Sequence, residues 1–238
     1  MQRYFAEIVN NNVYLQEQDV FHLTKVMRVK PHEHIEVVDQ NHNAFIATIE
    51  SLSPLDIKVV EPILKNSELD KQVTLFFALA KSDKIELVIQ KATELGASKI
   101  VLFQGERSVV KFSQSDFIRK EPRFLSIMKE ASEQCHREYI PEIYYEESIK
   151  GIEKHLADLN LFAYELEAGK DNQFIDLLNQ DNYKSISIIV GPEGGFSEKE
   201  AEYLDSLNFH RVSLGKRILR CETAAIYSLS VIASQLEK

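Results

Sequence analysis

The residues best suited to chemistry form a glycine-rich loop at 191–196, with the sequence Gly191-Pro192-Glu193-Gly194-Gly195-Phe196. An apolar, β-branched run precedes the loop and a helix-like segment follows it. This order predicts a tight loop at the carboxyl end of a strand, where open α/β sheets bind ligands. Phosphate-binding loops use bare N–H groups and usually a lysine, whereas this loop carries Glu193. Because a carboxylate repels phosphate, the loop suits a cationic or hydroxyl-bearing ligand.

Two further loops follow apolar runs in the same way. Residues 214–220 read Leu214-Gly215-Lys216-Arg217-Ile218-Leu219-Arg220, and Glu165 follows the apolar run 161–164. One such loop alone is more often a plain turn than a binding site. Loops at the carboxyl ends of neighbouring strands converge, so the three together predict one pocket with a carboxylate in one wall and cations in another.

The elements that must position these loops alternate between strands and helices after residue 71. Apolar runs at 73–79, 100–103, 161–164, 185–190 and 211–214 predict strands, and helical spacing is present at 85–95, 115–137, 148–159 and 173–178. Ser197 and Glu200 form a capping-box pattern at the start of the next helix. The residues that follow the loop at 214–220 predict a final helix with an apolar stripe. This alternation is typical of an α/β fold with a parallel sheet.

The preceding residues follow a different pattern, with short strands predicted at 3–9, 13–15, 34–39, 44–49 and 57–60 and one short helix at 19–27. Several short strands with one helix favour a small β-barrel. Residues 61–70 show neither period, which is typical of a linker. We therefore predict a barrel domain at 1–70 and an α/β domain at 71–238.

The composition, with 44% hydrophobic residues and a net charge of −9, is that of an ordinary globular protein. The charge argues against nucleic-acid binding by bulk electrostatics but leaves room for local basic patches. Without a secretory leader or a long apolar run, we expect a cytoplasmic protein with no membrane partner. Cys135 and Cys221 form no C-x-x-C pair and the histidines are scattered, so we expect no metal.

Beside this interpretation, the motifs at 191–196 and 214–224 closely resemble those of the RsmE family, which methylates N3 of a uridine in 16S ribosomal RNA. The resemblance extends over the whole chain, to residues 26–29, 91–96, 106–108 and 130–137. Met27 departs from the leucine expected there, a change that conserves volume.

The resemblance implies an amino-terminal PUA-like β-barrel that binds RNA, and a SPOUT methyltransferase domain, an alpha/beta knot with a trefoil knot near its carboxyl end. It further implies a homodimer that acts on 16S rRNA in the small ribosomal subunit, with S-adenosyl-L-methionine as cofactor. The implied cofactor-binding residues are Tyr164, Glu165, Gly191, Pro192, Glu193, Gly194, Leu214, Gly215, Ile218, Leu219 and Thr223. A sulfonium cofactor carries no phosphate, which agrees with a glycine loop that holds a glutamate.

Transfer to N3 of uridine requires loss of the imide proton, and arginine is suited to stabilise the charge that results. We predict this role for Arg220. Glu193 and Glu222 are candidates for proton acceptance or cofactor orientation, although Glu222 also suits a helix dipole. The predicted RNA contacts are Arg3, Lys25, Arg28, Arg107 and Arg137. For Arg107, Arg137 and Arg220, a structural salt bridge is the alternative.

Two other classes of function are left open by the residues. One is an RNA-binding module that keeps the fold without catalysis, and the other is a nucleotide-dependent kinase or dehydrogenase. The second is disfavoured because the sequence contains neither G-x-G-x-x-G nor G-K-[ST].

Overall fold

The protein consists of two compact units. A computed structural model describes residues 1–165, 174–180 and 182–237. The first unit comprises Met1–Glu68 together with Ser132–Tyr139, and the second comprises Leu69–Ala131 and Ile140–Lys238. The sequence predicts a boundary after residue 70, with residues 132–139 in the second domain. In the structure this segment instead joins the first unit.

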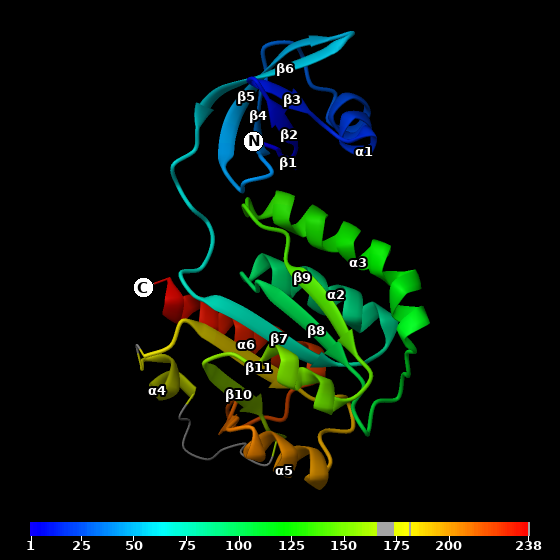
Figure 1. Cartoon of the computed structure of the whole chain (residues 1–238), viewed down its shortest axis with the longest axis vertical. Helices are drawn as coiled ribbons and strands as arrows, with labels where there is room; N and C mark the ends of the chain where they lie inside the picture. The colour runs from blue at the N-terminus through cyan, green and yellow to red at the C-terminus, as the bar shows by residue number, and fades with distance from the viewer. Residues whose placement is uncertain (166–173, 181, 238) are drawn as a thin grey trace. The chain divides into compact units, whose positions relative to one another are not determined.

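The first unit is built on a six-stranded, curled sheet with the order β1-β4-β5-β6-β3-β2 (Figure 1). Its strands are β1 (Arg3–Phe5), β2 (Glu7–Val9), β3 (Asn12–Tyr14), β4 (His34–Val38), β5 (Ala44–Leu52) and β6 (Leu55–Pro62). β1 runs parallel to β4, and the other pairs are antiparallel. β2 and β3 lie within the strands predicted at 3–9 and 13–15, and they pair as a hairpin across a turn in which Asn10 and Asn11 have φ of 50° and 68°.

The predicted helix at 19–27 starts earlier and changes its winding. It begins as α1 (Glu17–Phe21) and continues as the π-helix η1 (His22–Val26). Arg28, with φ 53°, lies just beyond its end. Leu23 is fully buried in the core of the first unit, whereas Lys25 and Arg28 are exposed. Leu23 thus packs the α1–η1 helix onto the core of the first unit, while Lys25 and Arg28 lie on the surface.

The second unit contains a six-stranded sheet in the order β12-β10-β11-β7-β8-β9, in which every pair is parallel. The strands are β7 (Gln72–Ala78), β8 (Lys99–Phe103), β9 (Glu142–Glu146), β10 (Leu159–Ala163), β11 (Ser185–Val190) and β12 (His210–Val212). The helices are α2 (Ser82–Glu94), α3 (Gln114–Gln134), η2 (Ile149–His155), α4 (Phe174–Leu178), α5 (Glu198–Ser206) and α6 (Cys221–Leu236). The predicted α/β fold with a parallel sheet is confirmed.

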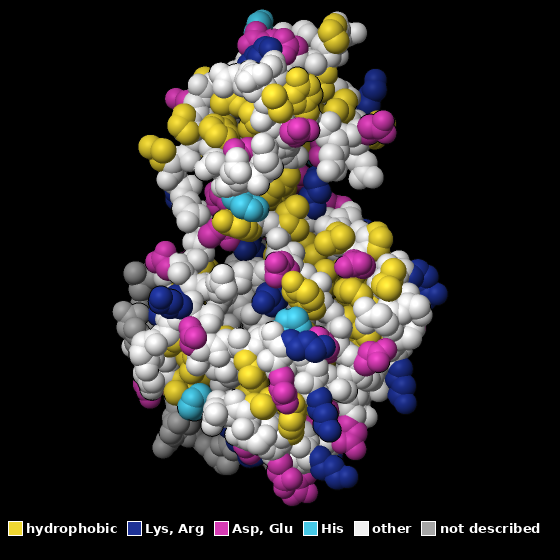
Figure 2. Space-filling model, in the orientation of Figure 1, with side chains coloured by type: hydrophobic (Ala, Val, Ile, Leu, Met, Phe, Trp, Pro, Cys, Tyr) yellow, Lys and Arg dark blue, Asp and Glu magenta, His cyan; other side chains and the backbone are white. Residues whose placement is uncertain are grey.

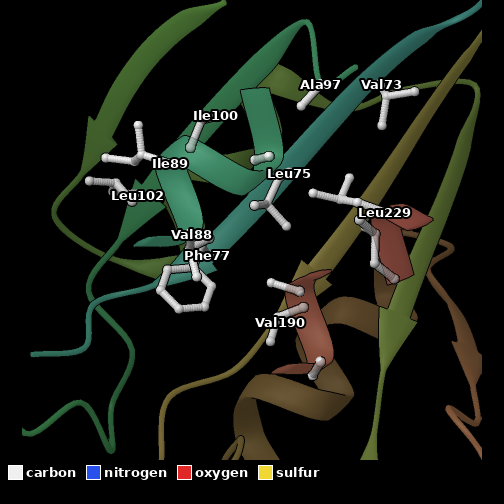
Figure 3. Packing of buried hydrophobic residues seen from close by; sticks show 14 of the residues in the cluster. Val73, Leu75, Phe77, Val88, Ile89, Ala97, Ile100, Leu102, Val190 and Leu229 are labelled. Atoms are coloured by element: carbon white, nitrogen blue, oxygen red, sulfur yellow. The ribbon is translucent and has the colours of Figure 1, made fainter. Parts of the chain in front are cut away.

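Both faces of this sheet are covered, which explains why its strands are continuous apolar runs. Val73, Leu75 and Phe77 of β7 belong to a core shared with α2, α3 and α6. Figure 3 shows part of this core, in which Phe77 of β7 lies next to Val88 of α2. Phe76 belongs to a second core, shared with α5 and η2 on the opposite face.

Two elements of the second unit, β9 and η2, differ from the sequence prediction. The edge strand β9 was not predicted. The helix predicted at 148–159 is a short 3₁₀ segment, η2, because β10 already begins at Leu159. The helix predicted at 173–178 corresponds to α4, although Gln173 lies outside the described residues. The trefoil knot stays a prediction.

Candidate functional site

The glycine loop follows β11 and leads into α5, as its sequence predicts. Ser197 is the N-cap of α5, its hydroxyl accepts from the Glu200 N–H at 3.2 Å, and the Glu200 carboxylate accepts from the Ser197 N–H at 2.8 Å. A Cβ on Gly191 would lie 2.7 Å from the buried ring of Phe196, so the loop closes on this ring only because residue 191 is glycine. The loop is therefore fixed at both ends.

Three strand-end loops enclose a cavity of about 520 Å³, within the range of small-molecule sites. They follow β10, β11 and β12, which are neighbours in the sheet and run parallel, so their carboxyl ends lie at one edge. Every residue predicted to bind a cofactor lines this cavity except Thr223. Tyr164 is held in the wall by Phe162, at 4.7 Å between ring centroids, and by Arg211, at 4.8 Å from its ring.

Other lining residues were not among the predicted site residues. They are Lys84, Ala163, Val190, Gly195, Phe196, Arg217, Cys221 and Ala224. Most belong to the predicted loops or border them, so continuity with the motifs is the signal that could have identified them. Lys84 belongs to the first turn of α2 and has no such signal in the sequence.

Lys84 lies between two carboxylates at the cavity wall. Its Nζ is 3.1 Å from Glu193 Oε1 and 3.2 Å from Glu222 Oε2. Burial opposes the charge of Lys84, but the hydrogen bonds with Glu193 and Glu222 outweigh it and raise the lysine pKa above its ordinary value. Lys84 is thus held in its ionised form.

Glu222 does not line the cavity itself; it lies behind Lys84 at the start of α6. Burial would raise its pKa, yet its own backbone N–H, the Cys221 thiol and Lys84 together hold the pKa below the ordinary value. The Cys221 Sγ donates to Glu222 Oε2 at 3.2 Å, and burial raises the thiol pKa to about 12. Cys221 therefore stays protonated near neutral pH, which disfavours a nucleophilic role.

The predicted arginines divide into two groups in the structure. Arg220 is exposed and lines the cavity, and exposed Arg107 donates from Nη1 to the Gly194 carbonyl at 3.2 Å. Arg3 is 3% exposed, and its guanidinium lies 2.8 Å from Glu36 and 3.0 Å from Glu138. Arg137, also 3% exposed, pairs with Glu68 at 2.6 Å.

The burial of Arg3 and Arg137 corrects their predicted place on an RNA-binding surface. Both guanidinium groups bind carboxylates inside the first unit, where such pairs hold chain segments together. Lys25 and Arg28 of the first unit and Arg107 of the second lie at the surface. These three remain the candidates for RNA contact.

Metal ligands and membrane spans can be assessed for the part of the chain that the structure describes. Among residues 1–165, 174–180 and 182–237, no group of His, Cys, Asp and Glu side chains is arranged to hold a metal ion. None of the helices described there is both long and apolar enough to cross a bilayer.

The fold and this pocket define an RNA methyltransferase. Residues 67–233 match the RNA methyltransferase domain family, and residues 15–61 match the RNA methyltransferase PUA domain. The chain is 34% identical to ribosomal RNA small subunit methyltransferase E of Bacillus subtilis, over all of this chain and 98% of that protein. It therefore belongs to the ribosomal RNA small subunit methyltransferase E family.

Solved structures agree with this assignment. Ribosomal RNA small subunit methyltransferase E of Neisseria gonorrhoeae, solved with S-adenosyl methionine bound, matches with a TM-score of 0.85 at 25% identity, over 98% of this chain and 97% of that one. A methyltransferase of Legionella pneumophila, also solved with this cofactor, matches with a TM-score of 0.84 at 27% identity over the same shares of the two chains.

Proposed function

We propose that the chain methylates N3 of a uridine in the 16S rRNA of the small ribosomal subunit, with S-adenosyl-L-methionine as methyl donor. The observation that carries the proposal is the cavity formed by the loops after β10, β11 and β12, in a chain of the methyltransferase E family. The base specificity rests on the sequence resemblance to the RsmE family.

The cavity fits this cofactor on chemical grounds. Leu214, Ile218 and Leu219 offer apolar surface to an adenosine, and the Glu193 carboxylate suits a sulfonium cation. The glycine loop offers backbone groups without a phosphate-binding lysine. When bound, the cofactor supplies an electrophilic methyl group, and the chain's own residues orient it and exclude water.

The main contribution of the enzyme to such a transfer is to position two reactants. N3 of uracil gives its proton to a base, for which Glu193 in the cavity wall is the candidate, and negative charge spreads to the two flanking carbonyl oxygens. Arg220 lines the cavity and is exposed toward solvent, which supports a role as hydrogen-bond donor to those oxygens. Because N3 lies on the pairing edge, the target base must be unpaired or extruded to reach the cavity.

Contact with the rest of the RNA is assigned to a few exposed cations. Figure 2 shows Lys and Arg side chains interspersed with Asp and Glu on the face that it draws. With a net charge of −9, the protein gains little from bulk attraction to phosphate. Lys25, Arg28 and Arg107 therefore contact RNA locally, and the enzyme acts as a cytoplasmic homodimer on an assembled small subunit.

The test is incorporation of labelled methyl from S-adenosyl-L-methionine into small ribosomal subunits from a strain lacking the enzyme. Digestion of the RNA should yield N3-methyluridine, and its absence after incubation with active protein would refute the proposed base. Binding of the cofactor without any methyl transfer would instead support a non-catalytic RNA-binding protein.

A further inference from the structure

Lys84 occupies a position where its charge is locally unfavourable. It lies in the first turn of α2, whose N-cap is Lys81, and the positive end of the helix dipole destabilises a cation there. Its side chain is nevertheless 20% exposed and directed to the cavity wall. The two carboxylates that surround Nζ offset this cost, so its placement serves the wall of the cavity rather than the helix.

The contacts of Lys84 connect three segments that are distant in the sequence. Glu193 belongs to the loop after β11, Glu222 belongs to the first turn of α6, and Lys84 bridges the two at 3.1 Å and 3.2 Å. Glu193 is 27% exposed and lines the cavity, whereas Glu222 is 15% exposed and does not. Lys84 therefore ties the accessible carboxylate to a less exposed one.

The bridge also sets the local charge. One lysine and two glutamates carry a formal charge of −1, which would be −2 without Lys84 and 0 after the loss of one of the two glutamates. S-adenosyl-L-methionine has a sulfonium cation where S-adenosylhomocysteine has a neutral thioether. This cluster of formal charge −1 therefore favours the sulfonium of the methyl donor over the neutral thioether of the product.

We propose that Lys84 is a positioning residue that holds Glu193 at the cavity wall and sets the charge of that wall, so that the pocket prefers the sulfonium to the thioether. The inference rests on the proposed function, because it concerns the same cavity and cofactor. The cavity is also lined by Arg217, Arg220 and Glu165. The substitutions that test the proposal leave these residues unchanged, so their charges contribute equally in every protein that is compared.

The experiment measures the dissociation constants of S-adenosyl-L-methionine and S-adenosylhomocysteine by calorimetry at low salt. Lys84→Met should raise the preference for the sulfonium about threefold to tenfold, the effect of one unit charge in a partly solvated site. Glu193→Gln and Glu222→Gln should lower the preference by a similar factor. Lys84→Arg keeps the charge and should stay within about twofold of the wild type.

The matched control is Lys91→Met, which removes a lysine from the same helix. Lys91 pairs with Glu94 at 2.8 Å and does not line the cavity, so its loss changes the net charge equally without touching the wall. Equal preferences in Lys84→Met and Lys91→Met would overturn the proposal, as would a lower preference in Lys84→Met.

Two further results separate the possible failures. Thermal unfolding without ligand shows which variants fold, and if Lys84→Met does not, the two glutamate variants still decide the sign of the effect. Failure of the wild-type protein to bind either compound would refute the proposed function itself. If the protein binds both compounds and none of the three charge substitutions changes the preference, only the role of Lys84 is refuted.

Discussion

Arg220 combines exposure with a place in the cavity wall, directly before the first residue of α6. Its predicted role is to stabilise negative charge on the uracil carbonyls, so Arg220→Ala should lower kcat for methyl transfer. Loss of one donor to a developing oxyanion typically costs about a hundredfold or more in kcat. The affinity for S-adenosyl-L-methionine should change much less, which calorimetry can establish.

The control for this change is Arg123→Ala. Arg123 is an exposed arginine of the same unit that pairs with Glu86 at 3.1 Å and does not line the cavity. The Arg123→Ala variant should retain the wild-type kinetics of methyl transfer. Full activity in Arg220→Ala would exclude Arg220 from the chemistry, whereas a weaker cofactor affinity with unchanged kcat would assign it to binding.

At the residue level, the sequence predicts the part of the site that follows strand ends. Gly191 and Leu214 are recognisable because glycines and charges interrupt apolar runs there. Lys84 was missed because a helical lysine is usually a solvated surface residue, and spacing does not reveal which loop faces it. Arg3 and Arg137 were assigned to RNA because their carboxylate partners are distant in the sequence.

At the element level, the agreement is best where several local signals coincide. β11 has the predicted bounds, 185–190, and the capping box of α5 forms as predicted, because an apolar run, glycines and a capping pair follow in order. β9 was missed since it is a short edge strand with only alternate residues buried. The helix predicted at η2 is too long, because apolar residues at helical spacing continue as far as the start of β10.

Glu200 gives a prediction at this level, because it holds two elements at once. Its carboxylate accepts from the Ser197 N–H and from the Glu106 N–H, both at 2.8 Å, and the side chain is buried. Glu200→Ala leaves both donors without this acceptor and should lower the free energy of unfolding by about 2–3 kcal/mol. Ser197→Ala removes only the cap and should cost about 1 kcal/mol.

Urea denaturation measures both losses, with Glu202→Ala as the exposed control in the same helix. The control should stay within about 0.5 kcal/mol of the wild type. Equal losses in Glu200→Ala and Ser197→Ala would mean that the bond to Glu106 adds nothing to stability.

At the scale of the whole molecule, each unit has a core of its own and the segment Ser132–Tyr139 belongs to the first. Glu36 binds this segment through His136 at 2.8 Å and also binds Arg3. Burial would raise the pKa of Glu36, but the hydrogen bonds from His136 and Arg3 outweigh burial and lower it.

A lowered carboxyl pKa stabilises the folded state above the unfolded pKa of about 4.5, and this stability is lost as the pH falls through the folded value. The stability difference between wild type and Glu36→Gln should therefore be constant near neutral pH and shrink below about pH 4.5. Denaturation of both proteins at several pH values measures it. A difference that stays constant down to about pH 3 would contradict the linkage.

Two sets of variants distinguish a buried arginine of the first unit from the exposed cations proposed to contact RNA. Arg137→Met breaks a buried pair with Glu68 and should lower the stability of the first unit by about 3–5 kcal/mol. Cofactor affinity should be unchanged, because the cavity belongs to the second unit. The double variant Lys25→Gln, Arg28→Gln changes exposed side chains and should leave stability within about 0.5 kcal/mol.

The same double variant should weaken binding to the ribosomal substrate uniformly across RNA sequences. The salt dependence of binding should fall by about one unit for each phosphate that the protein no longer neutralises. Binding measured over a salt series gives that slope, and thermal unfolding of the same samples gives stability. Suppose instead that the double variant does not change the slope of the salt dependence. If a folded Arg137→Met variant does lower this slope, RNA contacts lie near Arg137 and not at Lys25 and Arg28. The assignment made from exposure would then be wrong.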